Sequence, residues 1–226
     1  MLYNHNMSKI LLTGGAGFIG SHIADAYVEA GHNVVVVDDL SVGKKENINK
    51  KTKFYKADLR NKRQVEKILA QEKPTIVNHQ AAQKSVNYSV KDPLYDASIN
   101  ITGFLNLMEA AKANGVKKCI FASTGGAIYG DTKIFPTPEN ELPRPASPYG
   151  ITKFCSENYL RFYFATTGIM PVVLRYANVY GPRQDPLGEA GVIAIFSRLI
   201  LADKPVTVFG DGRQTRDYVF EIGRAH

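Results

Sequence analysis

Two side chains near the middle of the chain have the types and spacing of an acid–base pair. Tyr149 and Lys153 are four residues apart at the start of a predicted helix, so both lie on one helix face. A phenol has a pKa near 10, and making it a base at pH 7 requires roughly 4 kcal/mol. A neighbouring ammonium group supplies part of this energy, because positive charge favours phenolate. The pair predicts that Tyr149 exchanges a proton with a ligand, assisted by Lys153.

A hydroxyl group is expected beside this pair. The segment CIFASTGGAIYG, 119–130, indicates a strand that ends in Ser123 and Thr124. Open parallel sheets bind ligands at the carboxyl ends of their strands, so we assign the bond to a substrate oxygen to Thr124. In the alternative interpretation, the hydroxyls of Ser123 and Thr124 satisfy local backbone groups at the strand end.

The stretch TGGAGFIGSH, 13–22, is typical of a loop that holds phosphate. Gly14 permits a tight turn, Gly17 permits close approach of a ligand, and Gly20 permits close packing of the following helix. The helix N-terminus then offers N–H groups to a pyrophosphate. An ordinary glycine-rich turn is the alternative, but the run VVVVD places Asp38 about 20 residues on, where a carboxylate binds a ribose diol. A carboxylate there repels a 2′-phosphate, which favours NAD over NADP.

Alternating apolar runs and amphipathic segments predict an α/β fold with a Rossmann doubly wound parallel sheet. The expected strands lie near 9–13, 33–38, 53–57, 75–79, 117–123 and 171–176, and the expected helices near 18–30, 61–71, 93–114 and 148–167. Gly31 and Gly115 follow two of these helices as left-handed caps.

The composition fits a soluble, cytoplasmic protein of 226 residues. No apolar run approaches 18 residues, and no secretory signal is visible. The net charge of +7 is concentrated at 44–73, where few aromatic residues interleave the lysines, so we expect a solvated face and no nucleic acid partner. Cys119 and Cys155 fit buried thiols, with neither a metal site nor a disulfide.

We expect a dinucleotide-binding domain over 7–180 and part of a smaller substrate domain over 181–220. The second contains a predicted helix near 189–202 and a short strand at 206–209, and it begins without room to finish. Residues 1–6 fit an upstream extension, since Met7 can serve as the start. The ending EIGRAH, 221–226, fits a foreign addition.

Seven motifs between Met7 and Phe220 together resemble the extended short-chain dehydrogenase/reductase family, most closely its UDP-glucose 4-epimerases. They are TGGAGFIGSH, VVVVDDLSVGKKENI, NHQAAQKSV, FASTGGAIYG, SPYGITK, LRYANVYGPRQ and FGDGRQTRDYV. One departure concerns the hydroxyl: many epimerases have a run of serines where this chain has STGGA, so the alignment can fall on Gly125. We assign the role to Thr124.

The resemblance implies the functional residues position by position. The catalytic residues are Thr124, Tyr149 and Lys153. The NAD-binding residues are Gly14, Gly17, Phe18, Ile19, Gly20, Asp38, Asp39, Asp58, Leu59, Ala81, Ala82, Lys84, Asn100, Ser123, Tyr149, Lys153 and Tyr176. The substrate-binding residues are Lys84, Thr124, Tyr149, Asn178 and Arg216. Asp58 has an alternative interpretation as a helix N-cap.

The implied reaction is NAD-dependent epimerisation at C4 of a UDP-sugar, interconverting UDP-glucose and UDP-galactose through a transient 4-keto sugar. A homodimer through the helices near 93–114 and 148–167 is implied as well. A 4,6-dehydratase is the nearest alternative, but that branch has Asp-Glu after the threonine, where this chain has Gly125 and Gly126. A UDP-uronate decarboxylase or epimerase stays open. A non-catalytic NAD-binding regulator has no need of Tyr149 with Lys153.

Overall fold

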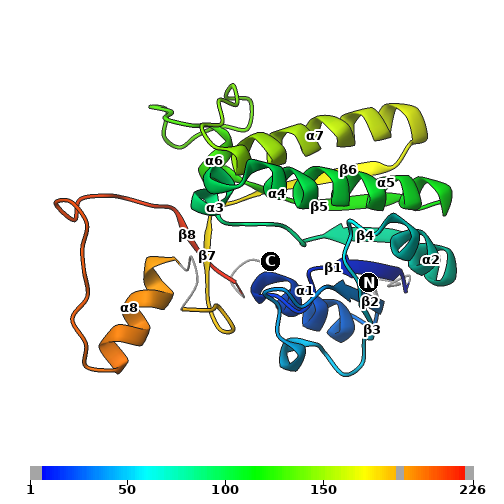
Figure 1. Cartoon of the computed structure of the whole chain (residues 1–226), viewed down its shortest axis with the longest axis horizontal. Helices are drawn as coiled ribbons and strands as arrows, with labels where there is room; N and C mark the ends of the chain where they lie inside the picture. The colour runs from blue at the N-terminus through cyan, green and yellow to red at the C-terminus, as the bar shows by residue number, and fades with distance from the viewer. Residues whose placement is uncertain (1–6, 187–190, 222–226) are drawn as a thin grey trace, which may run out of the picture.

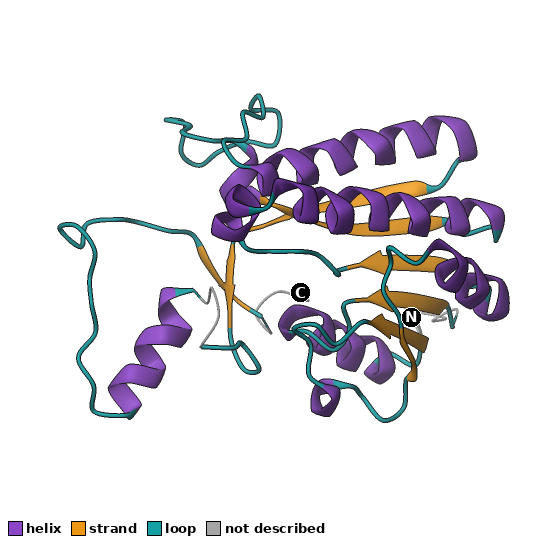
Figure 2. Ribbon diagram, in the orientation of Figure 1, coloured by secondary structure: helices purple, strands orange, loops and turns teal. Residues whose placement is uncertain are grey.

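A computed structural model describes residues 7–186 and 191–221, whose main feature is a six-stranded, fully parallel sheet (Figures 1 and 2). The strand order is β3-β2-β1-β4-β5-β6, so the order reverses between β1 and β4, where such sheets bind ligands. The strands are β1 Lys9–Thr13, β2 Asn33–Asp38, β3 Lys53–Lys56, β4 Ile76–His79, β5 Lys118–Thr124 and β6 Met170–Tyr176. The six predicted strands and the doubly wound fold are confirmed.

The helices alternate with the strands as predicted, and the structure adds several short helices. They are α1 Phe18–Glu29, α2 Lys62–Glu72, α3 Val86–Lys91, α4 Pro93–Ala97, α5 Phe104–Ala113, α6 Gly125–Ile128, α7 Pro148–Thr167 and α8 Val192–Leu201. A short 3₁₀ helix covers Lys45–Asn47. The single helix expected at 93–114 consists of α4, a π-helical stretch at Ser98–Gly103, and α5. Gly31 and Gly115 have φ of +83° and +71°, as expected for left-handed caps.

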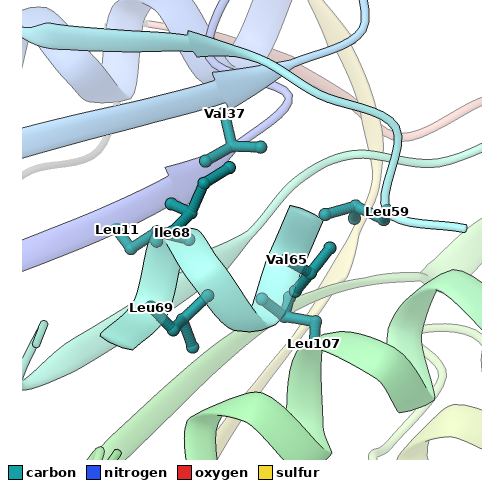
Figure 3. Close-up of a pocket in the computed structure, with 7 residues that line it drawn as sticks. All are labelled: Leu11, Val37, Leu59, Val65, Ile68, Leu69 and Leu107. Carbon is teal, nitrogen blue, oxygen red and sulfur yellow. The ribbon is translucent and has the colours of Figure 1, made fainter. Parts of the chain in front are cut away.

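The sheet buries a separate apolar core on each face, because successive strand residues point to opposite sides. Leu11 contributes to the core under α2, α5 and α7, while Leu12 contributes to the core under α1. Figure 3 shows part of the first core. Its seven labelled side chains leave no volume for a water molecule: Leu11, Val37, Leu59, Val65, Ile68, Leu69 and Leu107.

The segment after β6 forms a separate pair of strands. β7 (Asn178–Tyr180) pairs in parallel with β8 (Tyr218–Phe220), and α8 with the following chain extends away from the large sheet (Figure 1). The strand expected at 206–209 is absent from the described residues, so this prediction is wrong. Val208 and Phe209 are 55% and 83% exposed there, and this segment belongs to neither of the two sheets that the described residues form.

Some residues near the chain ends are not among those that the structure describes. Residues 1–6, the start of the helix expected near 189–202, and residues 222–226 are outside the described residues. The described helix in that region begins at Val192. The Glu221 amide donates to the Tyr180 carbonyl at 3.0 Å, and its carboxylate lies 3.2 Å from His22 Nδ1.

The basic segment at 44–73 has the exposure that the sequence predicts. The Lys and Arg side chains expected to form a solvated face at 44–73 are exposed. Within the described ranges, every helix is too short or too polar to cross a bilayer. Cys119 is fully buried, which raises the pKa of its thiol to about 12, whereas Cys155 is only half-buried.

Candidate functional site

The glycine loop between β1 and α1 has the shape that a phosphate-bearing ligand requires. Gly14 has φ of +72°, and a Cβ there would lie 2.6 Å from the Ala81 nitrogen. A Cβ on Gly20 would collide with the Gly14 carbonyl oxygen. Gly17 is the N-cap of α1, and no side chain caps that helix end. The first turn of α1, with half-buried Phe18 and Ile19, can therefore offer its N–H groups to an anion.

Asp38 stands at the end of β2 beside this loop and is 8% exposed. Its Oδ2 accepts from the Ala16 amide at 3.0 Å, and its Oδ1 accepts from the Leu40 amide at 2.8 Å. Burial raises the pKa of the carboxyl, while these two hydrogen bonds lower it. A ribose diol can still bind, because each carboxylate oxygen has a further lone pair. Asp39 is half-buried and accepts from the Ser41 amide and hydroxyl.

An open cleft of about 360 Å³ lies next to the β2 and β3 ends. It is lined by Asp39, Lys56, Ala57, Asp58 and Gln64. The Asp58 carboxylate is held by the Arg60 guanidinium, with 2.6 Å between Oδ2 and Nη2, which lowers the pKa of Asp58. The N-cap interpretation of Asp58 is wrong, because Asn61 caps α2 by accepting from the Gln64 amide. The Leu59 side chain packs in the core, and its backbone carbonyl accepts from Asn106 Nδ2 at 3.0 Å.

The segment after β4 is fixed against the glycine loop by buried polar groups. The Ala81 amide donates to Thr13 Oγ1 at 3.2 Å, and Thr13 Oγ1 lies 2.7 Å from His79 Nδ1. Burial lowers the pKa of His79 to about 3, so the imidazole is neutral and shares one hydrogen bond with the Thr13 hydroxyl. Ala81 and Ala82 are half-buried, and Lys84 is exposed.

Asn100 lies in the π-helical stretch and is 4% exposed. Its Oδ1 accepts from the Gln83 amide, and its Nδ2 donates to the Gln83 carbonyl, both at 3.0 Å. The Asn100 side chain therefore fixes the backbone of Gln83, the residue that precedes Lys84.

Asp96 belongs to the same cluster but was missed by sequence reasoning. Its carboxylate is fully buried and accepts from Gln83 Nε2 at 2.7 Å, Asn100 Nδ2 at 3.1 Å and Thr152 Oγ1 at 2.9 Å. Its charge opposes the effect of burial on the pKa of Lys153 and adds to that effect at Tyr149. The only sequence signal was the i, i+4 spacing from Asn100, which is common on helices.

The first turns of α7 carry Tyr149 and Lys153 to the end of β5. Ser147 caps α7 by accepting from the Gly150 amide at 3.2 Å, with Pro148 in the first turn. Lys153 is 3% exposed, and its Nζ donates to the Ala122 carbonyl at 2.7 Å and lies 5.9 Å from the Tyr149 ring centroid. Thr124 Oγ1 caps α6 by accepting from the Ala127 amide at 3.2 Å, as the alternative interpretation of this hydroxyl expects, and the same hydroxyl lowers the pKa of the neighbouring Tyr149. The structure thus brings Thr124, Tyr149 and Lys153 together.

Burial dominates the ionisation of this cluster. It raises the pKa of Tyr149 to about 12 against the opposing Thr124 hydrogen bond, and it lowers the pKa of Lys153 to about 8. At neutral pH Tyr149 is therefore a phenol beside an ammonium group. The phenol can lose its proton when further positive charge, such as that of an oxidised nicotinamide, stands close by.

Gly125 follows Thr124 directly. A Cβ at Gly125 would approach the Arg175 and Tyr176 carbonyl oxygens to 3.2 Å. This position therefore leaves little space for a hydroxyl-bearing side chain.

The remaining candidates lie in different surroundings. Ser123 is 3% exposed and donates to Glu157 Oε1 at 2.6 Å, so its hydroxyl is engaged inside the protein. The Tyr176 hydroxyl donates to Gln80 Oε1 at 3.4 Å, from the end of β6 to the end of β4. Asn178 and Arg216 are exposed, and they donate to the backbone carbonyls of Asp217 and Thr215. These last two side chains lie outside the Tyr149 cluster.

Comparison with known proteins agrees with this geometry. The sequence profile of the NAD dependent epimerase/dehydratase family matches residues 10–221. The UDP-glucose 4-epimerase of Mycolicibacterium smegmatis is 46% identical over 217 residues, covering 94% of this chain and 69% of its own length.

Two solved structures are similar throughout the shared region. UDP-glucose 4-epimerase from Thermotoga maritima, solved with UDP-glucose, has a TM-score of 0.93 and 53% identity, covering 95% of this chain and 70% of its own. The Thermus thermophilus enzyme, solved with NAD, has a TM-score of 0.90 and 49% identity, covering 94% and 70%. This chain therefore belongs to the NAD-dependent epimerase/dehydratase family.

Proposed function

We propose that the chain catalyses NAD-dependent epimerisation at C4 of a nucleotide sugar, with UDP-glucose and UDP-galactose as the substrate pair. The observation that carries this proposal is the cluster of Thr124, Tyr149 and Lys153 at the end of β5, on the same sheet edge as the uncapped α1 N-terminus. Similarity to epimerases solved with UDP-glucose and with NAD supports the same reaction.

NAD⁺ supplies a hydride acceptor and donor when it is bound. In its phenolate form, Tyr149 takes the proton of the sugar 4-hydroxyl and later returns it to the 4-keto oxygen, which gives the epimer after the sugar has turned over. Thr124 donates a hydrogen bond to the same oxygen. Lys153 holds positive charge beside the phenol, and the low-dielectric surroundings strengthen its effect on the Tyr149 pKa.

The dinucleotide site uses the residues around the glycine loop and the adjoining strand ends. The proposed contacts are Gly14, Gly17, Phe18, Ile19, Gly20, Asp38, Asp39, Asp58, Leu59, Ala81, Ala82, Lys84, Asn100, Ser123, Tyr149, Lys153 and Tyr176. Ser123 and Asn100 act indirectly in this scheme, because internal hydrogen bonds engage their side chains.

The sugar nucleotide is held mainly by its phosphates, which leaves the hexose free to turn. Lys84, Asn178 and Arg216 are the proposed substrate contacts. Residues 7–180 form the cofactor domain and residues 181–220 part of the substrate domain in this proposal. We further propose a cytoplasmic homodimer that associates through the helices at 93–114 and 148–167.

The test is incubation of the purified chain with UDP-galactose and separation of the products. UDP-glucose should accumulate to equilibrium without net consumption of NAD. A 4-keto-6-deoxy product would contradict the proposal and identify a dehydratase. The sequence opposes that result, because Gly125 and Gly126 supply no acid or base for elimination.

A further inference from the structure

Two charged side chains beside the Tyr149 cluster are buried and have no part in the chemistry described above. Glu157 lies one turn beyond Lys153 on α7, with a side chain 3% exposed, and Arg175 lies on β6 next to Tyr176, with a side chain 15% exposed. They form a bidentate pair, with 3.0 Å from Nε to Oε1 and 2.7 Å from Nη2 to Oε2. The pair raises the pKa of Arg175 further.

The pair is linked to the strand that carries the catalytic hydroxyl. Glu157 Oε1 also accepts from Ser123 Oγ at 2.6 Å, and Ser123 directly precedes Thr124. One carboxylate thus joins the end of β5, the catalytic helix α7 and the end of β6.

Arg175 extends the network to the segment that follows α6. Its Nη1 donates to the Tyr129 hydroxyl at 2.5 Å and to the Glu139 carbonyl at 3.1 Å, and its guanidinium lies 5.0 Å from the Tyr129 ring centroid. Glu139 belongs to the long connection between α6 and α7. The guanidinium therefore fixes part of this connection against β6.

We propose that Glu157 and Arg175 are positioning residues for the reaction, which set the placement of Thr124, Tyr149 and Tyr176 relative to one another. A buried pair of charges is weak evidence for stability alone, because its desolvation cost is large. Its geometry is specific, however, since a bidentate guanidinium fixes both distance and orientation. Small displacements of reacting groups cost large factors in rate. This inference rests on the proposed epimerase function.

The test compares Glu157→Gln, Arg175→Met and the double variant, with Glu72→Gln as the control. Glu72 is a buried carboxylate 2.8 Å from Lys9 Nζ and 2.5 Å from Lys53 Nζ, at the amino ends of β1 and β3, away from the site. We expect each site variant to lower kcat about tenfold or more with KM for UDP-galactose changed less than about threefold. Because Glu157 and Arg175 act as one pair, the double variant should have a kcat no lower than that of Arg175→Met. The control Glu72→Gln should lower Tm without lowering kcat.

Values of kcat within about twofold of wild type in all three site variants would overturn the proposal, as would an equal loss in Glu72→Gln. Should Arg175→Met fail to fold, Arg175→Lys keeps the charge and loses the planar fork. It should remain at least about tenfold slower than wild type, and full activity would contradict the positioning role.

Amide hydrogen exchange supplies a measurement that does not require turnover. Arg175→Met should raise exchange at 122–130 and 137–141, while Glu72→Gln leaves these segments protected. Unchanged exchange there would overturn the inference. Absence of turnover in the wild-type chain would instead contradict the epimerase function, and exchange would still decide the role of the pair.

Discussion

The ionisation of Tyr149 depends on opposing effects of its surroundings. Burial raises its pKa to about 12, and the Thr124 hydrogen bond acts in the opposite direction. Lys153 is buried as well, but its pKa of about 8 leaves it mostly charged at neutral pH. Reactivity therefore depends on hydrogen bonds and nearby positive charge. Tyr149 and Lys153 could be identified from their spacing in the sequence. The buried side chains of Asp96 and His79 could not, because their burial depends on residues far away along the chain.

Thr124→Val should reduce kcat for epimerisation by about 10²-fold, because it removes the hydroxyl that donates to the reacting oxygen in the proposed mechanism. Steady-state kinetics with UDP-galactose measures the loss. Thr166→Val, on the exposed face of α7, is the control and should keep the wild-type rate. An unchanged rate in Thr124→Val would remove Thr124 from the mechanism.

His79 should make stability fall on mild acidification. Its pKa is about 3 in the folded protein, against 6.5 for an unperturbed imidazole, so below pH 6.5 the unfolded state binds the extra proton. The free energy of unfolding should decrease by about 2–3 kcal/mol from this group between pH 6.5 and 4.5. Urea denaturation at both pH values measures this. His79→Phe should show a smaller decrease, and an equal decrease would contradict the assignment.

At the scale of elements, the site is assembled where β1, β4, β5 and β6 end and α1 and α7 begin. The strands β1, β2, β4 and β5 were predictable because each is a short and mostly buried run, whereas β3 and β6 are more exposed and follow from the alternation of strands with helices. The division of 93–114 was not, because a π-helical stretch differs from an α-helix by a shift of one residue in the hydrogen bonds, which the sequence pattern does not reveal. The error at 206–209 has a similar origin, since a strand requires a partner that sequence alone does not supply.

Gly20→Ala should greatly weaken NAD binding, because the added methyl group would collide with the Gly14 carbonyl and displace the phosphate-binding loop. Isothermal titration calorimetry with NAD⁺ measures the change, which we expect to be at least about tenfold in Kd. Gly191→Ala is the control, since the nearest atom to its added Cβ is the end of the Gln184 side chain at 3.7 Å. Equal Kd values for the two variants would contradict the role of the loop.

At the scale of the whole molecule, the described chain exposes apolar side chains on α7. Ile151 and Phe162 are 53% and 55% exposed and eleven residues apart, which places them on one helix face. The proposed homodimer accounts for this exposure. The chain spans 69–70% of the length of the similar proteins described above.

The variant Ile151→Glu/Phe162→Glu should be monomeric, because two charges on the α7 face would be buried without partners in the dimer. Light scattering coupled to size-exclusion chromatography should give twice the chain mass for the wild type and the single mass for the variant. Leu201→Glu, on exposed α8, should remain dimeric. A monomeric wild type would contradict the proposed dimer.

We propose that hydrogen leaves C4 as hydride and returns to the same carbon while Tyr149 carries the proton. The most direct measurement uses UDP-galactose deuterated at C4 in ordinary water, with mass spectrometry and NMR of the UDP-glucose formed. We predict full retention of deuterium at C4 with the wild-type chain, and a rate lower by about 10²–10⁴-fold with Tyr149→Phe. Loss of deuterium to the solvent would contradict this claim, because that loss would require proton abstraction from carbon.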